Sequence, residues 1–322
     1  MIEAYLREFR LMIVACICVI TLSVNCSAQP NAADSSKAAD SSSLPNIAKE
    51  DISFESMGVK LKGTLWRPAG EGPHPAIVCA HGSGKIDRND SYIREFAEYF
   101  SQKGIAVFTY DKRGVGESGG EYQGSFGGSM VVYAADVISA VNDLKKRADI
   151  RKDQVGLFGV SQGGYIIPLA AAMDKRGVAF TIIVSGPVVS IAEENLYSNL
   201  TGDTDGKPTG KTKEEITKEL KEYGSKGYDP YPFVEEMIRP GLWLYGELDK
   251  SVPVEESTAN LEEIKTRWKR KFTIRVFPDA DHGLKKTKTG NRWELPEPVE
   301  TVDGYFETIE KWLADQAVIK NP

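Results

Sequence analysis

The stretch FGVSQGG, residues 158–164, decides how this sequence is interpreted. It contains a match to the pattern G-x-S-x-G, which places a nucleophilic serine on a sharp turn between a strand and a helix. The apolar run QVGLFGV (154–160) leads into Ser161 and predicts a buried strand, and YIIPLAAAM (165–173) follows it and predicts a helix. We therefore predict that Ser161 is the nucleophile of an active site.

A second serine, Ser118, matches the same pattern in VGESGG (115–120). The residues that follow, EYQGSFGGSM (121–130), are rich in glycine and predict a loop. Residues 114–119 also fit the dinucleotide-binding pattern G-x-G-x-x-G, which has meaning only where its third glycine opens a helix. Because no helix is predicted there, we interpret the segment as a tight turn beside the active-site mouth, with neither a nucleophile nor a bound cofactor.

Short apolar runs and helical patterns alternate from about residue 50 onward. The runs typical of strands are DISFES (51–56), VKLKGTLWRP (59–68), PAIVCA (75–80), IAVFTY (105–110), QVGLFGV (154–160), FTIIVSG (180–186), GLWLYG (241–246) and FTIRVF (272–277). Helical patterns cover residues 91–104, 131–148, 165–173 and 304–316. The alternation predicts a mainly parallel sheet with helices on both faces, and the first two runs predict an antiparallel hairpin at its edge.

Residues 188–238 interrupt this alternation, because they contain no convincing strand. Its part from 207 to 238 reads as helix, loop and helix, and we predict that residues 188–238 form a helical cap inserted into the domain. Its aromatic residues either line a substrate pocket or form the core of the cap itself; they are Tyr197, Tyr223, Tyr228, Tyr231 and Phe233.

A serine nucleophile needs a base and an acid that orients the base. Of the three histidines, His74 precedes a strand between two prolines and is expected in a surface loop, and His81 begins the loop HGSG and is expected to shape it. His282 follows the last predicted strand and is the predicted base. Asp249, after the strand GLWLYG, lies between Ser161 and His282 in the chain and is the predicted acid.

The other carboxylates near these positions are weaker candidates for the orienting acid. Glu247 is the nearby competitor of Asp249. Asp279 and Asp281 are too close to the histidine in the chain to approach its ring from behind.

An oxyanion hole needs backbone N–H groups that converge from two loops. One should come from Gln162, which follows the nucleophile. The other should come from HGSG (81–84), which directly follows the strand PAIVCA, and we assign it to Ser83 with Gly82 as the alternative.

The bulk composition favours a globular protein that does not bind nucleic acid. The 322-residue chain is 41% hydrophobic and 27% charged, with a formal net charge of −6, whereas nucleic-acid binders are normally basic.

The N-terminus differs from the rest of the chain. LMIVACICVITLSV (11–24) has the length of a signal-peptide hydrophobic region, and small residues before Ala28 suit cleavage there. We predict a signal peptide over 1–28 and an exported protein, periplasmic or secreted, with no integral membrane domain after cleavage. The alternatives are a lipid anchor on Cys26 and an uncleaved membrane anchor. Residues 29–48 are rich in Ser, Ala and Asp and predict a flexible linker before a domain over 49–319.

Taken in chain order, these motifs resemble those of the α/β-hydrolase superfamily. More narrowly, the chain is similar to the dienelactone-hydrolase-like and acyl-peptidase-like serine hydrolases. The residues that carry the resemblance are HGSG (81–84), DKRGVGESGG (111–120), GVSQGG (159–164), GELD (246–249) and DADH (279–282). It implies an eight-stranded, mostly parallel sheet, a Ser-His-Asp triad, and no metal or organic cofactor.

Two residues qualify the resemblance. Dienelactone hydrolases themselves carry cysteine at the turn, so Ser161 points away from that particular activity. Pro168 lies within the helix after the turn and should bend it near Gly164, because proline removes a backbone hydrogen bond.

The function expected from these residues is the cleavage of a small-molecule carboxylic ester through an acyl-enzyme intermediate. A serine peptidase or aminoacyl hydrolase acting on short peptides, and an acyltransferase, are the alternatives with the same machinery. A non-enzymatic binding protein on the same fold is the alternative of a different class. The motifs specify neither the acyl chain nor the oligomeric state.

Overall fold

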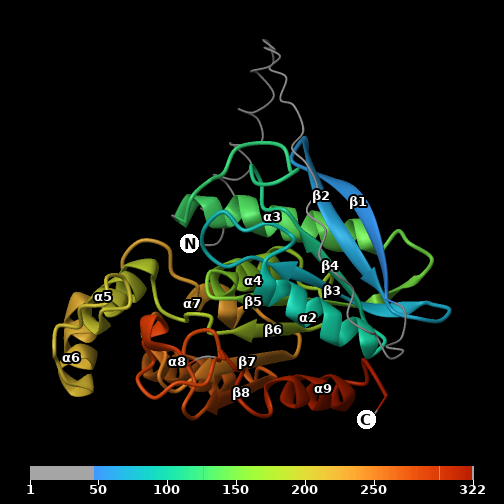
Figure 1. Ribbon diagram of the computed structural model, residues 1–322. Coiled ribbons are helices and arrows are strands. Elements are labelled where there is room, and N and C mark those ends of the chain that lie inside the picture. Colours follow the sequence, from blue (N-terminus) through green and yellow to red (C-terminus); the bar gives the residue numbers. More distant parts are fainter. Residues whose placement is uncertain (1–46, 126, 297, 321–322) are drawn as a thin grey trace, which may run out of the picture. The chain divides into compact units, whose positions relative to one another are not determined.

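The eight strands of the described residues form one sheet. The computed structural model describes residues 47–125, 127–296 and 298–320 (Figure 1). The strand order is β1-β2-β4-β3-β5-β6-β7-β8. The strands are β1 (Ala48–Ser56), β2 (Val59–Arg67), β3 (His74–Ala80), β4 (Ala106–Tyr110), β5 (Ile150–Val160), β6 (Thr181–Val184), β7 (Gly241–Gly246) and β8 (Phe272–Phe277).

The directions of the strands agree with the sequence-based prediction. β2 runs antiparallel to both β1 and β4, and the strands from β4 to β8 are all parallel to one another. The hairpin turns at Met57 and Gly58, which both adopt positive φ angles. The predicted mostly parallel, eight-stranded sheet with a hairpin at its edge is thus confirmed.

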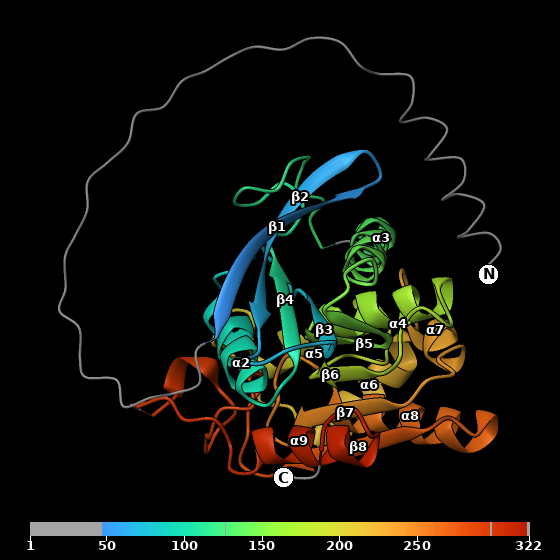
Figure 2. The same ribbon diagram turned by 90° about the vertical axis from the view of Figure 1, so that its right-hand side faces the viewer.

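Helices cover both faces of the sheet (Figure 2). One face is covered by α2 (Ser91–Gln102) and α9 (Tyr305–Asp315), and the other by α3 (Gly127–Leu144), α4 (Gly163–Met173) and α8 (Val254–Trp268). The helix α2 begins at Asp90, whose carboxylate accepts hydrogen bonds from the N–H groups of Tyr92 and Ile93. Apolar side chains of α2 and α9 pack with those of the sheet in one buried cluster, which fixes this layer.

The structure corrects three details of the sequence-based picture. His74 is the first residue of β3, half-buried, instead of a surface-loop residue, because its N–H bonds to Asp149 O at 2.8 Å. The helix α3 already begins at Gly127, within the segment expected to be a loop. Gly127 packs closely against the cap segment, because a β-carbon on it would lie 2.8 Å from Tyr228 Cβ. The helix α8 was not foreseen, although acidic residues in its first turn and basic residues in its last turn signal it.

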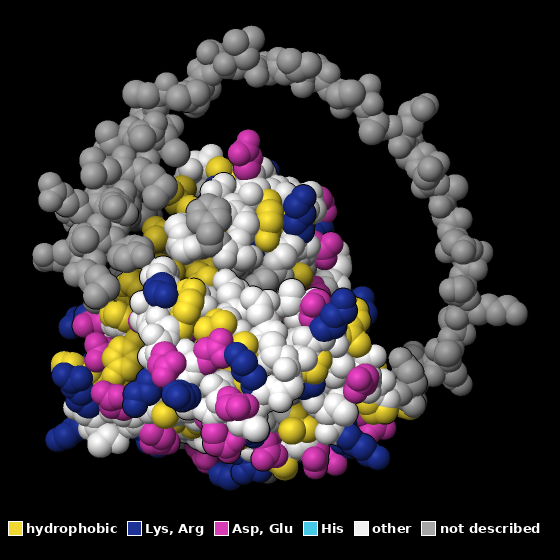
Figure 3. All heavy atoms as spheres, turned by 90° about the vertical axis from the view of Figure 1, so that its left-hand side faces the viewer, with side chains coloured by type: hydrophobic (Ala, Val, Ile, Leu, Met, Phe, Trp, Pro, Cys, Tyr) yellow, Lys and Arg dark blue, Asp and Glu magenta, His cyan; other side chains and the backbone are white. Residues whose placement is uncertain are grey.

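Three helices and no strand lie between β6 and β7, in the segment predicted to be a cap. They are α5 (Ile191–Thr201), α6 (Lys213–Tyr223) and α7 (Tyr231–Glu235). The first two begin with capping boxes, in which Ser190 and Thr212 exchange hydrogen bonds with a glutamate three residues later. The helices α5 and α6 lie on the left-hand side of Figure 1, which faces the viewer in Figure 3. On that side of the molecule, basic and acidic side chains are interspersed (Figure 3).

β1 begins at Ala48, one residue before the predicted boundary, while the predicted signal peptide and nearly all of the linker lie outside the described residues. No helix within the described residues is long and apolar enough to cross a bilayer.

The helix α4 packs unusually close to the loop after β6. A β-carbon on Gly164 would lie 2.3 Å from Gly186 Cα and 2.9 Å from Gly186 C, so this position has no room for a side chain. On the preceding residue, Gly163, a β-carbon would meet nothing closer than 3.6 Å. The helix α4 runs continuously through Pro168.

These neighbouring glycines give a matched pair for a test of packing. We expect Gly164→Ala to lower the free energy of unfolding by about 1–3 kcal/mol, because backbone must move to admit the methyl group. Gly163→Ala, the control, should leave the stability unchanged or raise it, since alanine favours the helix. Urea unfolding of both variants checks this, and equal stabilities would contradict the packing described.

Candidate active site

The predicted site residues all come from loops at one edge of the sheet. HGSG follows β3, Ser161 follows β5, Asp249 follows β7 and His282 follows β8. Parallel strands present their carboxyl ends at the same edge, where ligands of open α/β sheets bind. The topology therefore brings to one edge residues that lie between positions 81 and 282 of the chain.

Ser161 occupies a strained turn between β5 and α4. Its φ angle is 55°, in the left-handed region that non-glycine residues rarely adopt and that costs about 1–3 kcal/mol. The turn is held from both sides, because Ser161 N–H bonds to Val184 O at 2.9 Å and Ser161 O accepts from Gly164 N–H at 2.7 Å. This is the geometry expected of the G-x-S-x-G turn.

His282 and Asp249 form a hydrogen-bonded pair. The distance from His282 Nδ1 to Asp249 Oδ2 is 2.8 Å. The Asp249 side chain is fully buried, and its Oδ1 accepts hydrogen bonds from the N–H groups of Ser251 (2.8 Å) and Val252 (2.9 Å). With Nδ1–H donated to Asp249, the other ring nitrogen, Nε2, is free to accept a proton.

Several charges act on the His282 imidazole. Burial by itself lowers its pKa, but the charge and hydrogen bond of Asp249, together with Glu194 and Asp203, raise the pKa to about 9. A raised pKa means that protonated His282 stabilises the fold at pH values below its unfolded pKa of about 6.5, and this contribution is lost as the pH rises through 9.

In the described residues, the hydrogen bond of the His282 ring goes to Asp249 and not to a competing carboxylate. Glu247 is exposed, and Asp279 has a positive φ of 52° in the loop after β8. Asp281 accepts hydrogen bonds from the N–H groups of Gly283 and Lys285, both at 2.8 Å, so that it shapes the loop around the histidine.

The other serine and histidine candidates have structural partners. Ser118 Oγ donates to Asp111 O at 2.6 Å and accepts from Lys62 N–H at 3.0 Å, and no helix begins at Gly119. The His81 ring bonds through Nε2 to Tyr110 O, and burial together with the charge of Lys112 lowers the pKa of His81 to about 3. His81 is therefore neutral and holds the HGSG loop.

The two predicted oxyanion donors lie at the same cavity as Ser161. Gln162, Ser83 and the alternative Gly82 all line it. In the described part of the chain, the N–H groups of Gln162 and Ser83 have no hydrogen-bond partner, which leaves them available to a ligand. A β-carbon on Gly82 would lie 3.9 Å from Ser161 Cβ, so the HGSG loop passes directly beside the serine.

Lys112 is a residue of this site that the sequence-based reasoning missed. Its buried ammonium donates to Gly82 O (2.7 Å), Gly84 O (3.1 Å) and Gln162 Oε1 (2.8 Å), and burial lowers its pKa to about 7. It thus joins the HGSG loop to the residue after Ser161. DKRG (111–114) was cited only within a motif that carries the resemblance, and no role was predicted for Lys112.

The cavity beside Ser161 has a volume of about 430 Å³. His282 and Ser161 both line it, together with residues of α2, α4 and α5. Among the described residues of its wall, two are aromatic, Tyr92 and Tyr165.

The five aromatic residues singled out in the cap segment are absent from the described lining of this cavity. Tyr228 stacks on Phe233 with ring centroids 5.7 Å apart, and Tyr197 Oη donates to Asp249 O at 2.9 Å. Of the two roles considered for these aromatic residues, the contacts favour a place in the core of the cap over the lining of a substrate pocket.

Metal binding has no support in the described residues, which contain no group of three or more His, Cys, Asp or Glu side chains that could hold an ion.

The sheet order, the strained serine turn and the Asp249–His282 pair define this chain as a hydrolase of the α/β-hydrolase type, as the motifs predicted. Residues 92–297, more than half of the chain, match the model of the prolyl oligopeptidase family (Peptidase_S9), so the chain belongs to that family.

Comparisons with individual proteins agree with this assignment. Polyketide transferase claH of Penicillium crustosum is 30% identical over 201 residues, which are 62% of this chain and 60% of the transferase. Esterase EstD of Thermotoga maritima is 27% identical over 263 residues, 74% of this chain and 62% of the esterase. The chain thus spans less than two thirds of the length of either relative.

A solved structure shows the same fold at low identity. The Pyrococcus furiosus esterase Pf2001 superposes with a TM-score of 0.54 at 18% identity, over 72% of this chain and 82% of that one.

The hydrogen bond between Asp249 and His282 predicts a titration that NMR can follow. In Asp249→Asn, we expect the pKa of His282 to fall from about 9 to its ordinary value of about 6.5 or below, because the main charge that raises it is removed. Only three histidines contribute ring signals, which makes the spectrum tractable. Glu247→Gln, which alters an exposed carboxylate, should leave the titration unchanged; an unaltered titration in Asp249→Asn would contradict the assignment.

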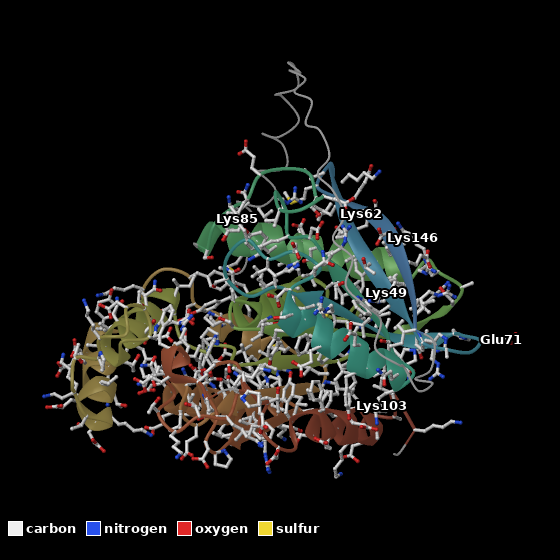
Figure 4. All side chains as sticks on the ribbon, in the orientation of Figure 1. Lys49, Lys62, Glu71, Lys85, Lys103 and Lys146 are labelled. Carbon is white, nitrogen blue, oxygen red and sulfur yellow. The ribbon has the colours of Figure 1, made fainter. Side chains whose placement is uncertain are left out.

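The contacts of Lys112 predict a loss of turnover rather than of substrate binding. We expect Lys112→Met to lower kcat on an ester substrate at least tenfold with little change in KM, because the HGSG loop loses its link to Gln162. The control is Lys85→Met, which alters an exposed lysine of the loop after β3 (Figure 4). Equal kcat values for both variants would show that the link does not position the loop.

Proposed function

We propose that this chain is a serine hydrolase that cleaves carboxylic esters of small molecules through an acyl-enzyme intermediate. The observation that carries the proposal is the Asp249–His282 pair, with an Nδ1–Oδ2 distance of 2.8 Å, at a cavity that His282 shares with the strained Ser161. The esterase name of one relative, EstD, supports the same substrate class.

The reaction would proceed in two steps. The Ser161 hydroxyl attacks the ester carbonyl while His282 Nε2 takes its proton, and the buried charge of Asp249 stabilises the resulting imidazolium. The N–H groups of Gln162 and Ser83 bind the oxyanion. His282 returns the proton to the departing alcohol, then activates a water molecule that releases the acid and restores Ser161.

Acyl transfer to an acceptor other than water is the second candidate. The relative named a polyketide transferase, at 30% identity, is the observation in its favour. Product analysis with added alcohols and amines separates the two, because a transferase forms the new ester or amide in preference to the free acid. The family assignment likewise keeps a peptidase or aminoacyl hydrolase open, which parallel ester and arylamide assays address.

Export remains part of the proposal. A signal peptide over 1–28 would deliver the domain to the periplasm or the medium, or a lipid on Cys26 would anchor it. Mass spectrometry of the mature N-terminus distinguishes cleavage after Ala28 from lipidation.

The two serines of the G-x-S-x-G matches provide the test of the nucleophile. We expect Ser161→Ala to lower kcat on a short p-nitrophenyl ester by at least about 10³-fold, because no other group can form the acyl-enzyme. Ser118→Ala, the control, should keep kcat within about threefold of the wild-type value, although it loses two buried hydrogen bonds and some stability. Retained turnover in Ser161→Ala would place the nucleophile elsewhere.

A further inference from the structure

The wall of the cavity that comes from α5 is polar. Glu194, Asn195 and Ser198 line it there, whereas Ile93 of α2 and Met130 of α3 contribute apolar side chains to the lining. The helix α5 is fixed to the loop of the orienting acid, because Tyr197 Oη donates to Asp249 O and Thr201 Oγ1 donates to Lys250 O. The polar side chains of α5 are therefore held at the cavity.

Among the carboxylates in the described lining of this cavity, Glu194 is the one that neither caps a helix nor pairs with a lysine or arginine, although its charge helps to raise the pKa of His282. Of the other charged side chains in the lining, Asp90 caps α2 and Arg292 pairs with Asp203. Within residues 47–125, 127–296 and 298–320, Glu194 forms no ion pair with a lysine or arginine. Burial raises the pKa of the Glu194 carboxyl to about 7, against the opposing effects of Tyr165 and His282.

Two buried polar atoms from the lining of the same cavity also lack a hydrogen-bond partner in the described structure. Tyr165 is 2% exposed, and in the described structure its Oη has no hydrogen bond within normal distance, although the Glu194 carboxyl lies nearby. Gln162 Nε2 is unpartnered in the same way, and both residues line the cavity. A buried hydroxyl without a partner costs about 1–3 kcal/mol, so a ligand that supplies the missing hydrogen bond is favoured.

Tyr165 is held rigidly in this position. Its ring packs edge-on against Tyr228 with centroids 5.7 Å apart, and its backbone carbonyl accepts a hydrogen bond from the Tyr228 hydroxyl at 3.0 Å. It lies one helical turn after Ser161, and Tyr165, Glu194 and the serine all line the same cavity.

We propose that Glu194 and Tyr165 bind the ammonium group of an aminoacyl substrate, so that the site takes esters or amides of amino acids with a free amino group. This inference rests on the proposed function for the position of the acyl group. The ammonium group neutralises the Glu194 carboxylate and donates a hydrogen bond to Tyr165 Oη. Its alkyl side chain packs against the apolar lining.

A binding experiment tests the ammonium site independently of turnover. In Ser161→Ala protein, calorimetry compares L-leucinamide with 4-methylpentanamide, which has the same carbon skeleton and lacks the amine. We expect leucinamide to bind at least tenfold more tightly, as a charge-assisted hydrogen bond provides. Adding Glu194→Gln should remove the difference. Equal affinities in the Ser161→Ala protein would overturn the proposal, whatever the enzyme hydrolyses.

Kinetics of the otherwise unmodified protein separate ammonium binding from an effect of Glu194 on His282. We expect Glu194→Gln to lower kcat/KM for L-leucine ethyl ester at least tenfold more than for ethyl 4-methylpentanoate, mainly through KM, because any effect on His282 acts on both esters alike. Glu222→Gln, an exposed carboxylate of α6, is the matched control and should change neither.

The outcomes of the kinetic experiment are distinct. Equal losses of kcat for both esters would mean that Glu194 acts only through the basicity of His282. The proposed ammonium site would then be wrong, whereas the proposed hydrolase function would remain supported. If neither ester is hydrolysed by the wild-type protein, the proposed function fails and the calorimetric comparison alone decides on the site. Should Glu194→Gln fail to fold, a wild-type preference below tenfold for the amino ester would contradict the proposal.

Discussion

The arrangement of the site depends on one constraint, which is the left-handed backbone of Ser161 between β5 and α4. A serine with a φ of 55° is unfavourable in isolation, and it is held by hydrogen bonds to Val184 and Gly164. The turn also requires α4 to approach the loop after β6 so closely that Gly164 and Gly186 have no space for side chains. The same close packing that strains the serine thus directs it away from the sheet and toward the cavity.

The electrostatics of the site follow from carboxylates around a single imidazole. Asp249 is buried and bonded to His282 Nδ1, while Glu194 reaches the same cavity from α5. Both raise the pKa of His282, and they differ in what else they contact: Asp249 is satisfied by backbone N–H groups, whereas Glu194 faces the space that a substrate would fill. A cation bound in that space would balance the negative charge of Glu194.

The sequence alone was sufficient to predict the features that depend on the order of strands and motifs along the chain. Each parallel strand ends at the same edge, so the positions of Ser161, Asp249 and His282 after their strands could be predicted from apolar runs and motif spacing. Lys112 and Glu194 were missed for a physical reason. Whether a lysine after β4 reaches Gly82, and whether a glutamate of α5 faces the cavity, depends on how a loop and a helix dock, and no local pattern encodes that docking. The helix α8, in contrast, carried charge signals that a closer reading would have used.

The central claim is that Ser161 and the two loops beside it form one acyl-transfer site. A crystal structure of the protein after reaction with a fluorophosphonate tests it most directly. The account predicts a phosphonate bonded to Ser161 Oγ, with its phosphoryl oxygen within hydrogen-bond distance of the N–H groups of Gln162 and Ser83 and its remaining substituent in the cavity. An unmodified Ser161, or an adduct whose oxygen points away from both N–H groups, would contradict it.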